Sequence, residues 1–187
     1  AAEMRNVMWE GELGSKIDLD TISKRKGLYG IGPLEYLRGE LMIYDGVSYV
    51  SKVAKDSSIR VYERFDVSAP FFVYANVVSW KVVELPVYIR KMDKLEHFID
   101  SISQDRELPF AFRLEGVVKS ARIHIQNLPK GTKVSSPEEA HQGQMNYQIG
   151  SRAVKIIGFF SRNHQGVFTH HDSYIHMHLI TENGKVM

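Results

Sequence analysis

Alternation of hydrophobic and polar residues dominates this chain and predicts a protein built mainly from β-strands. The clearest case runs from Glu40 to Ser51, where two apolar-rich stretches flank an Asp45-Gly46 pair. Aspartate followed by glycine supplies the positive φ angles that a two-residue hairpin turn requires. We therefore predict a β-hairpin with strands at 40–44 and 47–51.

Further strands are expected in both halves of the chain. Runs rich in β-branched and aromatic residues cover 59–65 and 71–80, and the second is apolar enough to be buried on both faces. Between the first helix and the hairpin, Gly27–Pro33 has the composition of a glycine-rich loop. The second half adds extended segments at 110–126, 145–149, 152–161 and 174–181.

Helical patterns are few and short. Residues 18–26 precede Gly27 and suit a short helix that ends at a glycine. Residues 92–104 form the best helix, because their apolar positions fall on one stripe and Asp93 with Glu96 suits a capping arrangement. Ser136-Pro137 predicts the start of a third helix, with serine as the cap and proline in the first turn.

Many strands beside a few helices indicate an α+β fold with mixed or antiparallel sheets. Pro86 marks the stretch between Trp80 and Asp93. We expect two fused β-rich halves there, residues 1–85 and 86–187, within one compact unit. An Asn183-Gly184 pair predicts a tight turn near the end of the chain, with three residues left to return.

Composition narrows the function classes. The 187 residues include 24 Lys+Arg against 22 Asp+Glu, a net charge of +2, and the charges are scattered. A nucleic-acid partner is therefore not expected, and a small-molecule partner is. The absence of cysteine removes disulfides and thiolate metal sites, and leaves the compartment, cytoplasmic or exported, undetermined. No signal-peptide pattern and no membrane-length apolar run is present, so no membrane partner is expected.

Histidines concentrate near the end of the chain and suggest a metal site. Four of the eight histidines lie between His170 and His178, and His164 precedes them. On a strand, His176 and His178 point to one face, while Ile175, Met177 and Leu179 point to the other. Two imidazoles on one strand face form half of a site for a divalent metal. A single strand histidine is more often a packed or surface residue, so this pattern needs a second signal.

That signal comes from a series of motifs spread along the chain. In order they are Gly30–Leu34, Arg38–Gly46, Pro109–Gly116, Ile156–Phe160 and Tyr174–His178. Together they resemble α-acetolactate decarboxylase. Each motif alone is modest, but the series keeps the family's order from about the first predicted helix to the end of the chain.

The resemblance implies a fold, a reaction and a set of residues. The family fold consists of two fused β-rich halves with a metal between them. The implied reaction converts 2-acetolactate to acetoin and carbon dioxide at a zinc ion, Zn²⁺. The ketone and hydroxyl oxygens of the substrate would chelate this ion, which would stabilise the resulting enediolate. By motif position, His176 and His178 correspond to two zinc ligands, and Glu40 and Arg113 to catalytic residues.

The chain also departs from the family pattern. The family's third histidine and a further functional glutamate correspond to positions past Met187, so we expect a natural continuation to supply them. The loop from Asn163 to Ser173 is longer and richer in histidine than its family counterpart. Without the resemblance, Glu40 would be an ordinary hairpin carboxylate, and Arg113 a salt-bridge partner of Glu115.

Two other functions stay open at this point. Whether two copies of the chain form a homodimer also stays open. His176, His178 and Glu182 echo the metal motif of cupins, although Glu182 abuts the predicted turn and the upstream glycine of cupins is absent. The stretch 176–186 also resembles a plant-and-prokaryote conserved domain, a non-catalytic binding module that shares the decarboxylase fold. Acetoin production separates an acetolactate decarboxylase from both.

Overall fold

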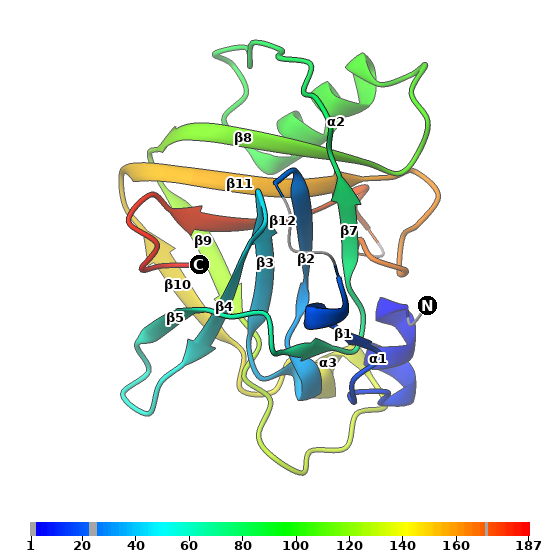
Figure 1. The fold of residues 1–187 in the computed structure, drawn as a ribbon, viewed down its shortest axis with the longest axis vertical. Helices are drawn as coiled ribbons and strands as arrows, with labels where there is room; N and C mark the ends of the chain where they lie inside the picture. The colour runs from blue at the N-terminus through cyan, green and yellow to red at the C-terminus, as the bar shows by residue number, and fades with distance from the viewer. Residues whose placement is uncertain (1–2, 23–25, 171) are drawn as a thin grey trace.

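The computed structural model describes residues 3–22, 26–170 and 172–187, and antiparallel β-sheets make up most of it (Figure 1). The largest sheet has five strands. Their order across the sheet is β5 (Ile59–Glu63), β4 (Val47–Val53), β3 (Glu40–Tyr44), β2 (Leu28–Pro33) and β7 (Val73–Asn76). All neighbouring strands in it are antiparallel.

A second sheet has three antiparallel strands, with β11 in the centre. Its order is β12 (Ile175–Thr181), β11 (Arg152–Phe160) and β8 (Phe110–Val118). In Figure 1 these strands run across those of the five-stranded sheet, and α2 (Met92–Ile102) lies beyond them. The small elements are β1 (Ile17–Asp18) with β6 (Ser68–Ala69), β9 (Ala121–Ile125) with β10 (Met145–Ile149), α1 (Met4–Glu10), α3 (Pro137–Ala140), η1 (Leu19–Thr21) and η2 (Glu35–Leu37).

The main core fills the space between the two sheets. Tyr29, Ile31 and Met42 from the five-stranded sheet pack with Ile157 and Phe159 of β11. The opposite face of β2 and β3 is buried as well, by residues of the segment that contains β1, η1 and β6. On the far side of the three-stranded sheet, α2 packs onto it. The expected α+β class, with few helices and antiparallel sheets, is confirmed.

Locally encoded elements appear where the sequence predicts them. Asp45 and Gly46 have φ angles of 48° and 84°, so the predicted hairpin turn between β3 and β4 is present. Ser136 caps α3 by accepting a hydrogen bond from the Glu139 N–H. The predicted helix α2 forms, but Lys91 occupies its N-cap without a side-chain hydrogen bond, so the expected capping arrangement is absent.

The glycine-rich segment 27–33 is a strand, and its interpretation as a loop is wrong. Residues 28–33 form β2, which is buried along its whole length. A Cβ atom on Gly32 would lie 2.5 Å from the Phe71 carbonyl oxygen, and one on Gly30 would lie 2.5 Å from the Phe72 ring. The glycines therefore allow the segment that contains Phe71 and Phe72 to approach β2 closely, and they do not form a turn.

Two other expectations need correction. The helix predicted at 18–26 is replaced by β1 and η1, while residues 23–25 of that range lie outside the described residues. The strand predicted at 71–80 is shorter, since β7 ends at Asn76, and its partly exposed residues show that it is an edge strand.

Among the described residues, no helix is long and apolar enough to cross a membrane.

The close approach at Gly32 predicts a stability effect. Gly32→Ala should lower the free energy of unfolding by about 1–3 kcal/mol, because the added methyl group meets a backbone carbonyl that cannot rotate away. Urea denaturation would measure the change. Gly150→Ala is the matched control, since nothing lies within 4 Å of a Cβ atom there. Equal effects of the two substitutions would contradict close packing at Gly32.

Candidate active site

Strand β12 presents His176 and His178 to the space between the two sheets. Their ring centroids lie 5.1 Å apart. As predicted, the intervening residues point to the opposite face of the sheet, where Ile175, Met177 and Leu179 join other apolar clusters. The alternation of the strand thus separates a polar face, aimed at the five-stranded sheet, from an apolar face.

His176 is held in one orientation by the backbone. Its Nδ1 lies 2.7 Å from the carbonyl oxygen of Phe168. A carbonyl can only accept, so Nδ1 carries the hydrogen and Nε2 keeps its lone pair. Burial, followed by the neighbouring His178, lowers the pKa of His176 well below its usual value. The ring is therefore neutral near pH 7, and its Nε2 is free to bind a cation.

His178 is neutral for the same main reason. Burial, with a smaller contribution from His124, lowers the pKa of His178 to about 3, against the opposing hydrogen bond with the Leu41 backbone. Its Nδ1 is buried and has no hydrogen-bond partner of good geometry. Gln126 Oε1 is another of the buried unpaired side-chain atoms in the described residues. Unpaired buried polar atoms are rare, and they often indicate a place for water or an ion.

Glu40 faces His178 from the first position of β3. Its Oε1 accepts a hydrogen bond from the Gln126 N–H at 3.0 Å, and its Oε2 lies 3.8 Å from Nε2 of His178. Burial raises the pKa of Glu40 to about 8, against the smaller opposing effect of the Gln126 hydrogen bond. With Glu40 protonated and His178 neutral near pH 7, the pair is a contact between neutral groups rather than an ion pair. Only 9% of the Glu40 side chain and 11% of the His178 side chain are exposed, so water reaches both poorly.

Other histidines gather around this pair. The His170 ring lies 5.6 Å from the His176 ring, centroid to centroid. His124, on β9, interacts electrostatically with both His176 and His178 and lowers their pKa values. Sequence reasoning missed His124, because a lone histidine on a strand in another part of the chain carries no local signal.

Two more histidines of this region were candidates in the sequence. His164 Nδ1 lies 2.7 Å from Ser161 Oγ, and its ring stacks on Phe168, so its contacts are local. His171 lies outside the described residues. Within the part of the chain that the structure describes, no three His, Asp or Glu side chains converge closely enough to hold a metal ion.

Arg113 lies on the same sheet face as His178, but the two side chains contact different residues. Ile157 of β11 pairs with His178 on one side and with Arg113 on the other. Two strand spacings, roughly 10 Å, therefore separate the two backbones. The Arg113 guanidinium lies 5.0 Å from the centroid of the Trp80 ring, 3.3 Å from the Tyr29 hydroxyl and 3.6 Å from a Glu115 carboxylate oxygen.

An open cleft of about 740 Å³ borders Arg113. Tyr29, Trp80, Asp45 and Lys26 line it together with Arg113, and no histidine does. Beside this cleft, the Tyr44 hydroxyl donates a hydrogen bond to Glu115, and burial and this bond raise the pKa of Tyr44.

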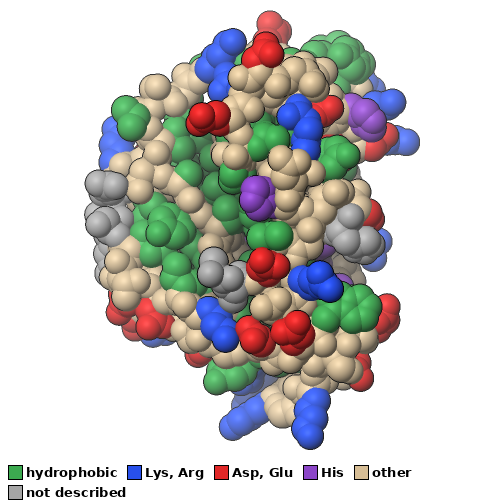
Figure 2. Space-filling model, turned by 90° about the vertical axis from the view of Figure 1, so that its right-hand side faces the viewer, with side chains coloured by type: hydrophobic (Ala, Val, Ile, Leu, Met, Phe, Trp, Pro, Cys, Tyr) green, Lys and Arg blue, Asp and Glu red, His purple; other side chains and the backbone are tan. Residues whose placement is uncertain are grey.

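Figure 2 shows hydrophobic side chains in a hollowed strip on the side of the molecule at the right of Figure 1. The structure thus brings His176, His178 and Glu40 together. It places Arg113 in a separate cleft, which Lys26 also lines.

Comparisons with known proteins point to one family. The model of the family α-acetolactate decarboxylase matches residues 3–186. A solved α-acetolactate decarboxylase from Bacillus subtilis strain 168 superimposes with a TM-score of 0.78 at 22% identity, over 98% of this chain and 75% of that one. The enzyme from Bacillus subtilis subspecies spizizenii gives 0.77 at 22% identity, with the same coverage.

A third solved structure is a Staphylococcus aureus protein of unknown function described as similar to α-acetolactate decarboxylase. It gives a TM-score of 0.78 at 18% identity, over 98% of this chain and 75% of that one. At these identities the structural likeness establishes the fold. No curated protein sequence gives a significant match.

The pKa of Glu40 predicts how stability depends on pH. Between its unfolded value of 4.5 and its folded value of about 8, the folded state holds a proton that the unfolded state has released. The free energy of unfolding therefore falls as pH rises, with a slope of up to about 1.4 kcal/mol per pH unit. His178, with its pKa lowered from 6.5 to about 3, acts in the opposite direction below pH 6.5. The decline should therefore appear between pH 6.5 and 8.

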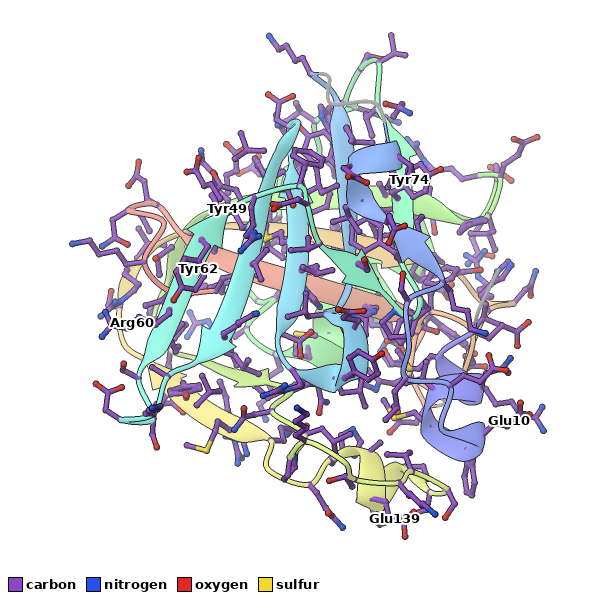
Figure 3. All side chains as sticks on the ribbon, turned by 60° about the horizontal axis from the view of Figure 1, so that its bottom comes forward. Glu10, Tyr49, Arg60, Tyr62, Tyr74 and Glu139 are labelled. Atoms are coloured by element: carbon purple, nitrogen blue, oxygen red, sulfur yellow. The ribbon has the colours of Figure 1, made fainter. Side chains whose placement is uncertain are left out.

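Urea denaturation across this pH range, with a chelator present, would measure the decline. Glu40→Gln cannot ionise, so the slope between pH 6.5 and 8 should flatten. Glu10→Gln, at the exposed end of α1 (Figure 3), is the control and should keep the slope. A slope that persists in Glu40→Gln would show that Glu40 is not the group that titrates.

Proposed function

Because the chain belongs to the α-acetolactate decarboxylase family, a family of carboxy-lyases, we propose that it converts 2-acetolactate to acetoin and carbon dioxide with zinc bound through His176 and His178. The observation that carries this proposal is the pair of neutral, largely buried imidazoles on one face of β12, with the protonated Glu40 beside His178. Production of acetoin from 2-acetolactate by the purified protein is its direct test.

The histidine pair fits two of the ligands of a zinc ion. Two imidazoles bound to one tetrahedral zinc through bonds of about 2.1 Å hold their ring centroids about 5 Å apart. The observed separation is 5.1 Å. His176 has the tautomer that such binding requires, with Nδ1–H engaged by a backbone carbonyl and Nε2 unprotonated. A catalytic zinc normally has three protein ligands, so the pair supplies part of the set.

The chemistry of the substrate explains why these groups suit it. When bound, zinc supplies a Lewis acid for the ketone and hydroxyl oxygens of 2-acetolactate and so favours departure of carbon dioxide. Glu40 then provides the proton that the substrate carbon needs after the carboxyl group has left. A carboxyl group with a pKa of about 8 holds that proton near neutral pH, and the Gln126 N–H fixes its orientation.

Arg113 is the group suited to the substrate carboxylate. Its guanidinium is always charged and offers two parallel donors to a carboxylate. The Trp80 ring and the Tyr29 hydroxyl hold it at the cleft, and 35% of its side chain is exposed there. The Glu115 contact, 3.6 Å long and half exposed, is the salt bridge that an ordinary structural role would give. Such exposed pairs stabilise little, so this contact leaves Arg113 able to bind an anion.

The metal proposal predicts loss of zinc from histidine variants. His176→Ala and His178→Ala should each lose bound zinc on dialysis, and acetoin production with it, because each removes one of two rigidly held ligands. Elemental analysis after dialysis measures the metal. His97→Ala is the control: His97 is exposed on α2 and contacts the Asp93 carbonyl oxygen, so its loss should leave zinc unchanged. Unchanged zinc in the His176 and His178 variants would overturn the assignment.

The role of Arg113 predicts a defect that charge alone does not repair. Arg113→Lys should reduce kcat/KM by about tenfold or more, about 1.4 kcal/mol, because lysine keeps the charge but loses the planar pair of donors. Zinc content and the circular dichroism spectrum should not change. Arg60→Lys, on the edge strand β5, serves as the control (Figure 3). A reduction below about twofold, about 0.4 kcal/mol, would return Arg113 to a purely structural role.

A further inference from the structure

The carbonyl oxygen that fixes the His176 ring belongs to a short turn, residues 164–169, in the connection between β11 and β12. Phe168 contributes this oxygen, which lies 2.7 Å from Nδ1 of His176. A backbone carbonyl moves only when its segment of chain moves. The orientation of His176 therefore depends on how firmly the 164–169 turn is held beside β12.

The 164–169 turn is closed by hydrogen bonds of its own. The Val167 N–H donates to the His164 carbonyl oxygen at 3.0 Å, and the Gly166 N–H donates to the Thr169 carbonyl oxygen at 2.9 Å. Thr169 is fully buried, and its hydroxyl donates to the His164 carbonyl oxygen at 3.3 Å. The rings of Phe168 and His164 stack with their centroids 5.3 Å apart. These contacts fix the shape of the turn.

Helix α1, from the other end of the chain, holds this turn in its place. The Met4 N–H donates to the Val167 carbonyl oxygen at 2.7 Å, and the Arg5 N–H donates to the Gly166 carbonyl oxygen at 2.8 Å. The first amides of a helix have no acceptor within the helix itself. Here the two carbonyls that directly precede Phe168 in the turn serve as their acceptors. Figure 1 shows α1 below the connection that carries this turn.

Helix α1 is also fixed to the other side of the candidate site. Its buried Met4 side chain packs in one cluster with Leu37 and Leu128. The Leu128 N–H donates to the Leu37 carbonyl oxygen at 2.9 Å. Leu37 lies three residues before Glu40, and Leu128 lies two residues after Gln126, whose N–H holds Glu40. The helix thus joins the segments that position Glu40 to the turn that positions His176.

We propose that α1 is a positioning element of the candidate site: the Met4 and Arg5 amides hold the 164–169 turn so that the Phe168 carbonyl keeps the hydrogen of His176 on Nδ1. Without these two bonds the turn can shift relative to β12, and a neutral imidazole that loses its acceptor populates both tautomers. The inference rests on the proposed function in one respect, because Nε2 of His176 is the atom that would bind zinc. The tautomer itself is a property of the metal-free chain.

The tautomer can be measured directly by nitrogen-15 NMR of histidine in the metal-free protein. The parent should show His176 with its hydrogen on Nδ1 alone. Met4→Pro removes the amide hydrogen that reaches Val167, and proline suits this position, because it is the first of the helix and Glu3 before it is extended. This variant should show a second population with the hydrogen on Nε2. Met4→Ala is the matched control, since it loses the same side chain but keeps the amide, and it should keep the single tautomer.

Zinc affinity gives a second readout, measured by competition with a chromophoric chelator. Met4→Pro should bind zinc about tenfold more weakly, the effect expected when the partner that orients a metal-binding histidine is disturbed. Met4→Ala should bind zinc as the parent does. Thr169→Val is a second variant with an intact α1: it keeps nearly the same volume, removes the hydroxyl bond to His164, and should shift the tautomer in the same direction.

Each outcome decides the role of α1. A single Nδ1–H tautomer in both Met4→Pro and Thr169→Val would overturn the proposal. Equal changes in Met4→Pro and Met4→Ala would also overturn it, because the lost side chain would then be the cause. If the parent binds no zinc, the proposed function fails, while the NMR measurement on the metal-free chain still decides whether α1 sets the tautomer of His176.

Discussion

Exclusion of water between the two sheets is the constraint on which the candidate site depends. Strands β2 and β3 are covered on both faces, and the three-stranded sheet supplies one of the covers. The same burial that forms the core keeps His176 and His178 deprotonated and Glu40 protonated near pH 7. Packing thus sets the protonation states of the proposed metal ligands and the proposed proton donor, and the glycines of β2 allow that packing to be close.

Elements encoded by neighbouring residues were predictable from the sequence. The Asp45-Gly46 turn, the Ser136 cap and the alternation of β12 each depend on a few adjacent positions, and each is present. Strand β2 was not predictable in this way, because its glycines have the composition of a loop. Their role becomes clear only when the packing of Phe71 and Phe72 on them is known. Similarly, the apolar spacing at 18–22 suits a helix, but those residues cover the outer face of the large sheet.

The candidate site shows the same division between local and distant information. The shared face of His176 and His178 follows from the period of a strand. Their contact with Glu40, and the approach of His124, follow from pairing between segments far apart in the chain, which one sequence does not encode in a visible pattern. Family resemblance pointed to Glu40 and Arg113. Only the structure shows that Glu40 contacts His178 while Arg113 contacts Trp80.

Trp80 links the cleft at Arg113 to the segment between β7 and α2. Its ring contacts Arg113 and Tyr29 at the cleft, and its backbone belongs to residues 77–91, where Val78, Val82 and Val87 are exposed. A cation that binds a carboxylate works best when it is already positioned. The packing of Trp80 and Tyr29 around the Arg113 guanidinium would therefore favour binding of a substrate carboxylate at this place.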